Sequence, residues 1–186
     1  MKKLLFAAVT AVAMAASAEM KVGTVDLMLL VKNHPNYESN ETLLTATDKD
    51  YQKKLDAIKA EGDKLQEEGK GLAEQMRNPM LTPKAKTDVE NQLVEIQKKL
   101  MAIEQRYRNE AMRSRQDLLD LQARLQKTTT DDLRKRISKY AEEQKFDLIL
   151  DQNATPYSKK DLDVTDALLK AMGVEPKDAK GRDEGK

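Results

Sequence analysis

Two long segments of the chain carry apolar residues at a seven-residue repeat, and a proline-containing turn separates them. The repeat in the first segment comprises Leu44, Tyr51, Ile58, Leu65 and Leu72, with Leu55 and Met76 beside them. In the second segment, residues 89–107, steps of four and three residues alternate. This spacing keeps one apolar edge of a helix, its seam, against a partner helix. Because prolines end helices, residues 78–83 predict a tip, and the whole pattern predicts a helical hairpin.

The two helices of this hairpin are expected to differ in length. The outgoing helix is expected to begin near Ser39 or Asn40, either of which can cap free amides, and to end near Arg77. At the rise of an α-helix it would be about 55 Å long. Thr82 and Pro83 favour the start of a returning helix of about 60 residues. Its last turns would extend beyond the hairpin and dock into a small body.

Two features interrupt the regular repeat. Gly62 and Gly69 stand seven residues apart at seam positions, where each lowers helix stability by roughly 1 kcal/mol relative to alanine. They are consistent either with a flexible zone that lets the arm spread or with a close approach of the two helices. In the returning helix a second four-residue step, near Tyr107 and Ala111, predicts local unwinding of the supercoil.

Short segments at both ends of the hairpin predict a small β body. The expected elements are a strand at 21–26, a helical turn at 27–31, a strand at 146–151, a turn at 153–156, a last strand at 157–158 and a helix at 163–172. Residues 174–186 are polar and aperiodic, so a disordered tail is expected. Two or three short strands form a marginal sheet with exposed edges. The expected fold is therefore α+β, predominantly α, with a body that oligomerisation completes.

The first 18 residues match the pattern of a secretory signal peptide. Lys2 and Lys3 supply the positive start, residues 4–16 the apolar stretch, and Ala16-Ser17-Ala18 the small-residue cleavage site. A retained membrane anchor is the rival interpretation, but this stretch falls short of the roughly 20 apolar residues that span a bilayer. The chain has no Cys, which excludes a disulfide and a thiol-linked lipid. The mature chain is expected to begin after Ala18 in an exported compartment.

Charge and composition indicate an exposed, elongated binding protein. Removal of Lys2 and Lys3 from the 33 basic residues leaves 31 against 32 acidic ones, so the mature chain has no general attraction for nucleic acid. Charged residues make up 35% of the chain and aromatic residues 4%, a balance typical of long exposed helices. A two-helix arm with a narrow seam leaves no room for a buried catalytic pocket.

Catalysis has little support in the sequence. His34 is the only histidine, and it stands beside Pro35 in an expected loop, where a satisfied or exposed role is favoured over that of a catalytic base. There is no cluster with metal-ligand spacing and no glycine-rich phosphate loop. We therefore expect a protein that is not an enzyme and that needs no cofactor or metal.

Several motifs of the chain form a recognisable set. They are Lys21-Val22-Gly23-Thr24-Val25-Asp26 with a proline nine residues on, Glu104-Gln105 before arginine-rich sequence, Phe146-Asp147-Leu148-Ile149-Leu150-Asp151-Gln152-Asn153-Ala154, and Tyr157-Ser158 with Asp163-Val164-Thr165. In these motifs and their order the chain resembles the Skp (OmpH) family of periplasmic chaperones, which hold unfolded outer-membrane proteins. The resemblance covers about residues 20–172. The hairpin adds to it, although long helices resemble one another by composition alone.

The resemblance implies a homotrimer with a shared, barrel-like β body and three arms that project around a central cavity. The apolar residues assigned to that body are Val22, Val25, Leu148 and Leu150. The residues alone predict an oligomer but not the number of its copies. The near-neutral charge departs from the family, whose familiar members are strongly basic, so a lipopolysaccharide site is not carried over and anionic lipid stays an open partner.

The tip of the hairpin offers candidate binding residues of two kinds. Met76, Met80 and Leu81 are apolar, and thioether side chains adapt to varied apolar partners. Positive charge surrounds them at Lys70, Arg77, Lys84 and Lys86. Met76 is also explained as the last seam residue.

An arginine cluster in the returning helix is the second candidate. It comprises Arg106, Arg108, Arg113 and Arg115, whose guanidinium groups can grip carboxylates or phosphates bidentately. The alternative is a solvated flank with weak ion pairs to Glu104, Glu110 and Asp117.

The leading functional hypothesis is an ATP-independent periplasmic holdase for unfolded outer-membrane proteins. The alternative from another class is an exported structural or adaptor protein that binds one folded partner. The chain is accordingly divided into a signal peptide at 1–18, a first body segment at 19–38, an arm at 39–128 with its tip near 78–83, a second body segment at 129–172, and a tail at 173–186.

Overall fold

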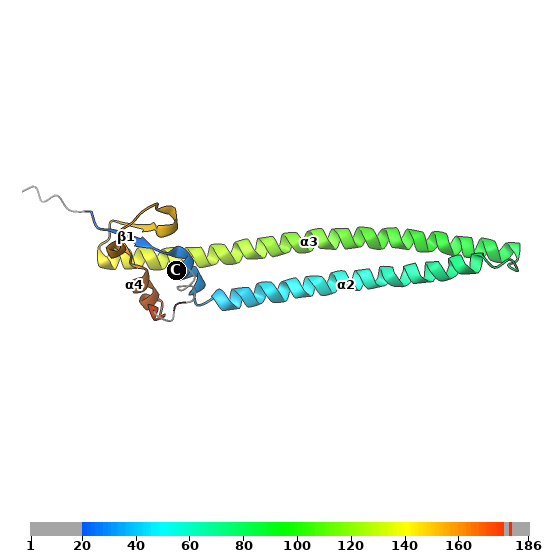
Figure 1. The fold of residues 1–186 in the computed structure, drawn as a ribbon, viewed down its shortest axis with the longest axis horizontal. Helices are drawn as coiled ribbons and strands as arrows, with labels where there is room; N and C mark the ends of the chain where they lie inside the picture. Colours follow the sequence, from blue (N-terminus) through cyan, green and yellow to red (C-terminus); the bar gives the residue numbers. More distant parts are fainter. Residues whose placement is uncertain (1–19, 177–178, 180–186) are drawn as a thin grey trace, which may run out of the picture.

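The chain forms a long two-helix arm attached to a small body. The computed structural model describes residues 20–176 and 179, so the predicted signal peptide lies outside the described residues. The elements in chain order are β1 (Val22–Val25), α1 (Leu27–Lys32), α2 (Tyr37–Met76), α3 (Pro83–Gln144), β2 (Leu148–Asp151), the 3₁₀ turns Gln152–Ala154 and Lys160–Leu162, and α4 (Thr165–Ala171). The arm is made of α2 and α3, and the other elements gather at one end of it (Figure 1). The predicted hairpin is confirmed.

The tip is built from side chains that satisfy free backbone groups. The outgoing helix ends at Met76, and the returning helix begins at Pro83. The Thr82 hydroxyl accepts a hydrogen bond from the Ala85 N–H at 3.3 Å, and the Asn78 side-chain oxygen accepts one from the Met80 N–H at 3.0 Å. Proline is tolerated at the first helical position because its missing N–H would have had no partner there. The predicted tip is therefore confirmed.

The outgoing helix begins earlier than predicted. Its first residue is Tyr37, not Ser39 or Asn40. The carbonyl of Asn36 already accepts a hydrogen bond from the Asn40 N–H at 2.9 Å, so the chain is helical before either expected cap. The turn after α1 leads directly into α2 through the backbone bond from the Tyr37 N–H to the His34 carbonyl, at 2.9 Å. Because backbone hydrogen bonds begin the helix and no side chain caps it, this start has no capping residue by which the sequence could mark it.

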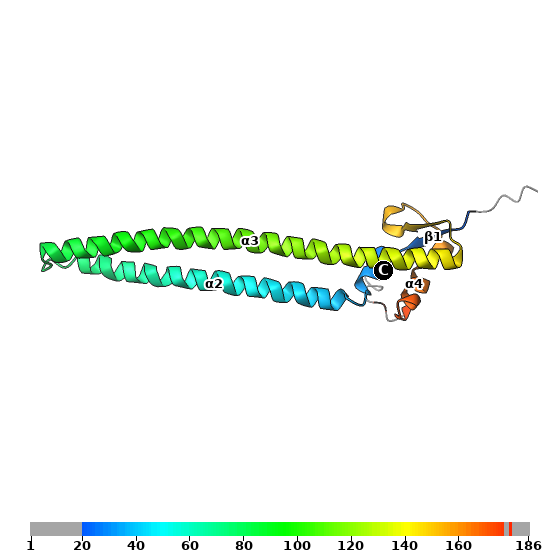
Figure 2. The same cartoon turned by 180° about the vertical axis from the view of Figure 1, so that it is seen from behind.

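The two helices meet along the predicted seam. Ile58, Val89 and Ile96 are each less than a tenth exposed, and most other members of the repeat are half-buried. Side-chain hydrogen bonds between the helices join Tyr51 to Asp117, Arg106 to Glu61 and Asn40 to Thr129. At the predicted slip the returning helix stays a single α-helix, and Tyr107 is 39% exposed. Its 62 residues exceed the 40 of α2, and the excess runs into the body (Figure 2).

The seam glycines face isoleucines of the partner helix. A Cβ atom at Gly62 would lie 3.4 Å from Ile103 Cγ2, and one at Gly69 would lie 3.5 Å from Ile96 Cγ2. A Cβ atom at either position would thus make ordinary van der Waals contact across the seam, so the close-approach interpretation of these glycines is not supported. Neither position requires a missing side chain on steric grounds.

Replacement of Gly62 or Gly69 by alanine is expected to stabilise the arm. The gain is roughly 1 kcal/mol for each change, because alanine restores helix propensity and its Cβ fits against the facing isoleucine. Urea unfolding followed by circular dichroism measures it. Gly71→Ala is the matched control, since a Cβ atom there meets nothing within 4 Å. A loss of stability at position 62 or 69, with a gain at 71, would mean that the helices are too close for a methyl group.

The body contains a two-stranded parallel sheet. Strands β1 and β2 pair with Val22 opposite Leu148 and Thr24 opposite Leu150. On the other side of β1, Thr24 forms an isolated bridge with Asp163. The predicted strand at 157–158 is wrong: those residues have no strand structure, and Tyr157 is 79% exposed. Asp163 takes the place beside β1 because the Val164 N–H donates to the Thr24 carbonyl at 2.8 Å.

The two strand motifs meet around Phe146. The Lys21 ammonium lies 4.2 Å from the centre of the Phe146 ring and donates to the Gln144 carbonyl at 2.7 Å. The same ring covers Gly23, where a Cβ atom would lie 3.1 Å from it. A methyl group at position 23 would therefore press against the ring, which would have to move by a few tenths of an ångström to accept it.

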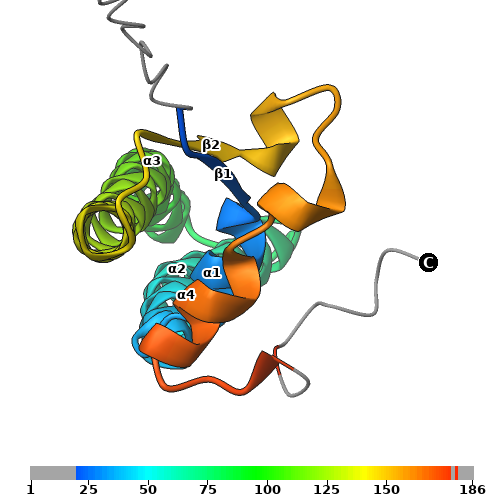
Figure 3. The same cartoon turned by 90° about the vertical axis from the view of Figure 1, so that its left-hand side faces the viewer.

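The core of the body is a single apolar cluster that draws on both ends of the chain. Leu30, Leu168 and Leu169 are at most 1% exposed and pack with Leu133 from the end of the returning helix. Figure 3 shows the body from its end, with α4 against α1 and the strands beside them. The helix α4 begins at Thr165, two residues later than predicted, and the sheet strand β2 begins at Leu148 rather than at 146.

The start of the predicted tail belongs to the body. The Val174 N–H donates to the Leu169 carbonyl at 2.9 Å, and Val174 packs against the core. Ala179 is 7% exposed within the same cluster. The expectation of a disordered tail from residue 174 is therefore wrong at these two positions, because two small apolar side chains in a polar stretch suffice to cover the core. The other tail residues beyond 176 lie outside the described residues.

Candidate functional site

The arm tip presents one strongly exposed apolar side chain. Met80 is 86% exposed, whereas Met76 and Leu81 are half-buried. Met76 thus takes the position of the last seam residue, which was the alternative interpretation. Among the predicted tip cations, Lys70 forms an ion pair with Glu67 at 3.1 Å, while Arg77, Lys84 and Lys86 have no ion pair within the described residues.

The arginine cluster divides into paired and unpaired members. Arg106 forms an ion pair with Glu61 across the seam, and Arg108 forms one with Glu104 on its own helix. Arg113 and Arg115 have no carboxylate at ion-pair distance in the described part of the chain. Two of the four guanidinium groups are therefore already engaged by carboxylates of the chain itself.

A row of exposed apolar side chains along the returning helix was missed by the sequence analysis. We call it the α3 stripe, and it consists of Val94, Met101, Met112 and Leu119, which are 49%, 61%, 65% and 51% exposed. Val94 and Met112 are 18 residues apart, as are Met101 and Leu119, and 18 residues make about five helical turns. All four residues therefore share one face. The sequence does contain a signal for the stripe, since each of its four residues directly follows a seam position.

Two shallow grooves lie between the stripe and the outgoing helix. Met101 borders a groove of about 490 Å³ whose lining includes Gly62 and Ile103. Leu119 borders a groove of about 350 Å³ whose lining includes Leu55 and Leu118. Met101 and Leu119 thus lie at the margins of two recesses whose linings mix apolar and polar side chains.

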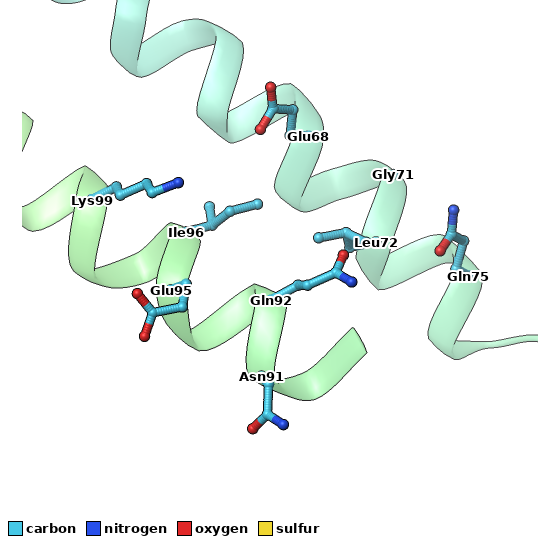
Figure 4. A pocket seen from close by; sticks show the side chains of 9 residues that line it. All are labelled: Glu68, Gly71, Leu72, Gln75, Asn91, Gln92, Glu95, Ile96 and Lys99. Atoms are coloured by element: carbon cyan, nitrogen blue, oxygen red, sulfur yellow. The ribbon is translucent and has the colours of Figure 1, made fainter. Parts of the chain in front are cut away.

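A third groove lies nearer the tip, on the other side of the hairpin. Its volume is about 540 Å³, and its lining residues are Glu68, Gly71, Leu72, Gln75, Asn91, Gln92, Glu95, Ile96 and Lys99 (Figure 4). Leu72 and Ile96 point toward each other between the helices, while polar and charged side chains surround them. The side chains at the margins of this groove are therefore mostly polar or charged, unlike the four apolar side chains of the stripe.

The residues predicted for an oligomer body take two different positions. Leu148 and Leu150 are 42% and 40% exposed on one face of β2, and Val22 of the neighbouring strand is half-buried. Val25 is 2% exposed and belongs to the chain's own core. Met28 on α1 is 61% exposed and lines an apolar groove of about 610 Å³. The body therefore carries uncovered apolar surface on the sheet and beside α1.

Comparison with known proteins assigns the family. The family described as outer membrane protein (OmpH-like) matches residues 21–172. The chain belongs to the OmpH-like family. This confirms the resemblance drawn from the strand motifs, and the OmpH-like family is a family of periplasmic chaperones rather than of enzymes. A comparison with curated proteins found no match.

The single histidine of this OmpH-like chain has a structural position. His34 is 6% exposed, and its Nδ1 accepts a hydrogen bond from the Asn36 N–H at 3.1 Å. The ring proton therefore lies on Nε2, which donates to Asp132 at 2.9 Å. Asp132 also accepts from Arg136 at 2.6 Å. His34 thus joins the turn before the arm to the returning helix, and of the two expected roles, satisfied or exposed, it has the satisfied one.

Asp132 gives the arm root of the OmpH-like chain an expected acid sensitivity. Hydrogen bonds from Arg136 and from His34 lower the pKa of Asp132 below its usual value of 3.8. The folded state therefore favours the carboxylate, so the stabilisation is complete above about pH 4 and is lost as the pH falls through the lowered pKa. Urea unfolding of the wild type and of Asp132→Asn should show a difference that shrinks below pH 4. An equal difference at pH 3 and pH 7 would contradict this expectation.

Two searches bear on other kinds of site in the OmpH-like chain. Among the described residues, no helix combines the length and apolar character needed to cross a bilayer. Within the same residues, no group of three histidine, aspartate or glutamate side chains is placed to hold a metal ion.

Proposed function

We propose that this OmpH-like chain is an ATP-independent holdase that keeps unfolded outer-membrane proteins soluble in the periplasm. Family membership supports the general class of periplasmic chaperone. The specific clients, the export of the chain and the absence of an energy source are parts of the proposal. The observation that carries it is an arm of about 60 Å, the length of the 40-residue outgoing helix, along which apolar side chains stay exposed.

The chemistry of the arm suits unfolded chains better than a single folded ligand. Its exposed apolar side chains are scattered from Leu43, which is 47% exposed, to Met80 at the tip. Many weak contacts spread over a long surface bind a flexible chain by multivalency and still allow its release without ATP. Methionine side chains adapt to partners of different shape. A folded partner would instead need one contiguous complementary patch.

We also propose that the working form is a homotrimer joined through the bodies. The uncovered sheet face of Leu148 and Leu150 and the groove beside Met28 are two different apolar surfaces. When one copy docks its first surface on the second surface of the next copy, the contact is head-to-tail, and such contacts form a ring when the rotation between copies closes on itself. The number three is taken from the family resemblance. A ring of bodies would direct the arms around a shared cavity.

Light scattering after dilution tests the holdase proposal. A urea-denatured outer-membrane β-barrel precursor is diluted into buffer with the purified mature chain, with an inert exported protein, or alone. We expect scattering to stay near the buffer baseline only with the mature chain, and without added ATP. Scattering as high as with the inert protein would refute the proposal. Capture of one folded protein at fixed stoichiometry, with no protection of unfolded chains, would favour the adaptor alternative.

A further inference from the structure

We propose that the α3 stripe, and not the arm tip or the arginine cluster, is the main surface on which the arm contacts an unfolded client chain. This inference rests on the proposed holdase function and assigns it to particular residues. The stripe runs for about 38 Å along the returning helix, from Val94 to Leu119.

The face that carries the stripe is almost free of net charge, although 35% of the chain is charged. The polar side chains that share this face are Lys98, Gln105, Arg108 and Gln116. The two cations are neutralised on their own helix, Lys98 by Glu95 at 2.8 Å and Arg108 by Glu104. No carboxylate stands on this face between the first and last members of the stripe. An apolar segment of a client that covers this face therefore does not bury an unpaired charge.

Glutamines between the apolar residues suit the backbone of an unfolded chain. Gln105 and Gln116 are exposed, and each amide donates one hydrogen bond on its own helix, to Asn109 at 3.1 Å and to Asp120 at 2.8 Å. Each amide keeps a second donor hydrogen and its carbonyl oxygen for a client. An unfolded client presents free N–H and C=O groups at every residue, and covering these groups without a hydrogen-bond partner costs free energy. Alternating methionine, leucine and amide side chains can thus cover client segments of many sequences.

The spacing of the stripe favours an extended chain over a second helix. A helix that packs as a coiled coil needs two apolar residues in each heptad. The stripe supplies one residue at intervals of seven or eleven, which is too few for such a seam. A flexible chain can use the separate contacts, and it can place side chains in the adjoining grooves of about 490 and 350 Å³. We therefore assign the stripe to the client and not to the arm of another copy.

Substitution of all four stripe residues by glutamine tests the assignment. The variant is V94Q, M101Q, M112Q and L119Q in the full mature chain, and the probe is a fluorescently labelled β-barrel precursor diluted from urea. Because partial burial of four apolar side chains is lost, we expect the dissociation constant to rise at least about tenfold. The matched control changes the same positions conservatively, as V94I, M101L, M112L and L119M, and should bind like the wild type. Met80→Gln at the tip should change affinity less than about twofold.

The outcomes separate this inference from the function on which it rests. If the wild type itself fails to bind the precursor, the proposed function fails and the assignment fails with it. If the wild type binds and the glutamine variant binds equally well, the stripe assignment alone is overturned. A changed particle mass in the glutamine variant would also overturn it, because the stripe would then join copies of the chain.

A crosslinking measurement keeps the test independent of any effect of four substitutions on folding. A photoreactive amino acid at position 112, on the stripe, should capture the precursor. The same group at position 113 lies about 100° further around the helix and should capture at least fivefold less. Equal capture at both positions would contradict the assignment.

Discussion

Replacement of Leu148 and Leu150 by aspartate is expected to separate the assembly into single chains. Both side chains are about two-fifths exposed in the isolated chain, so the change leaves the body's own core intact. In the proposed ring, however, two carboxylates would enter an apolar contact, where burial of an unpaired charge is strongly unfavourable. Size exclusion coupled to light scattering should report the mass of one chain with unchanged helical circular dichroism.

Tyr157→Asp is the matched control for this experiment. Tyr157 is 79% exposed on the same body but lies outside the sheet. The control should keep the wild-type mass. Should the Leu148 and Leu150 variant keep that mass as well, the sheet face would not be part of the interface.

Replacement of Leu30 by alanine is expected to destabilise the body by about 2–5 kcal/mol. Leu30 is 0% exposed and lies among Leu168 and Leu169, which are equally enclosed, so the lost side chain leaves a cavity. That is a large part of the roughly 5–15 kcal/mol that stabilises an ordinary domain. Urea unfolding at matched chain concentration measures the change, since assembly makes stability concentration-dependent.

Leu43→Ala provides the comparison, because Leu43 is 47% exposed near the root of the arm. Its effect should be below about 0.5 kcal/mol, as for other surface changes. Similar losses for both variants would mean that the cluster around Leu30 does not control the stability of the chain.

The arm could be predicted from the sequence because its stability depends on a local, periodic pattern. Seam residues such as Ile58 follow one another at a seven-residue spacing. The tip carries a helix-capping residue followed directly by a proline, a combination that few other turns contain. Both signals lie within short stretches of the chain. The start of α2 lies two or three residues before its predicted position, because backbone bonds made by His34 and Asn36, without a side-chain cap, determine it.

The body was harder to predict because its contacts join distant parts of the chain. Thr24 pairs with Leu150 on one side and with Asp163 on the other, and no local pattern specifies which segment fills the second place. The strand expected at 157–158 was assigned by its length and composition. Val174 and Ala179 reach the core from a stretch whose average character is polar.

Candidate binding residues stand out in the sequence by the chemistry of single side chains and not by their arrangement on the helix. The tip and the arginine cluster are conspicuous in the sequence, yet Arg106 and Arg108 are held by Glu61 and Glu104 in the folded chain. The stripe that includes Met101 and Met112 becomes visible only when residues beside the seam are placed around the helix. Pairing and exposure are properties of the fold.

The most direct test of the central claim is the mass of the particle that the mature chain forms alone and with an unfolded outer-membrane β-barrel precursor. Size exclusion coupled to light scattering measures both masses in one buffer without ATP. We expect three chains alone, and three chains with one precursor in a single soluble peak. A single-chain mass, or a mass that the precursor leaves unchanged while the precursor itself aggregates, would contradict the proposed assembly and its function.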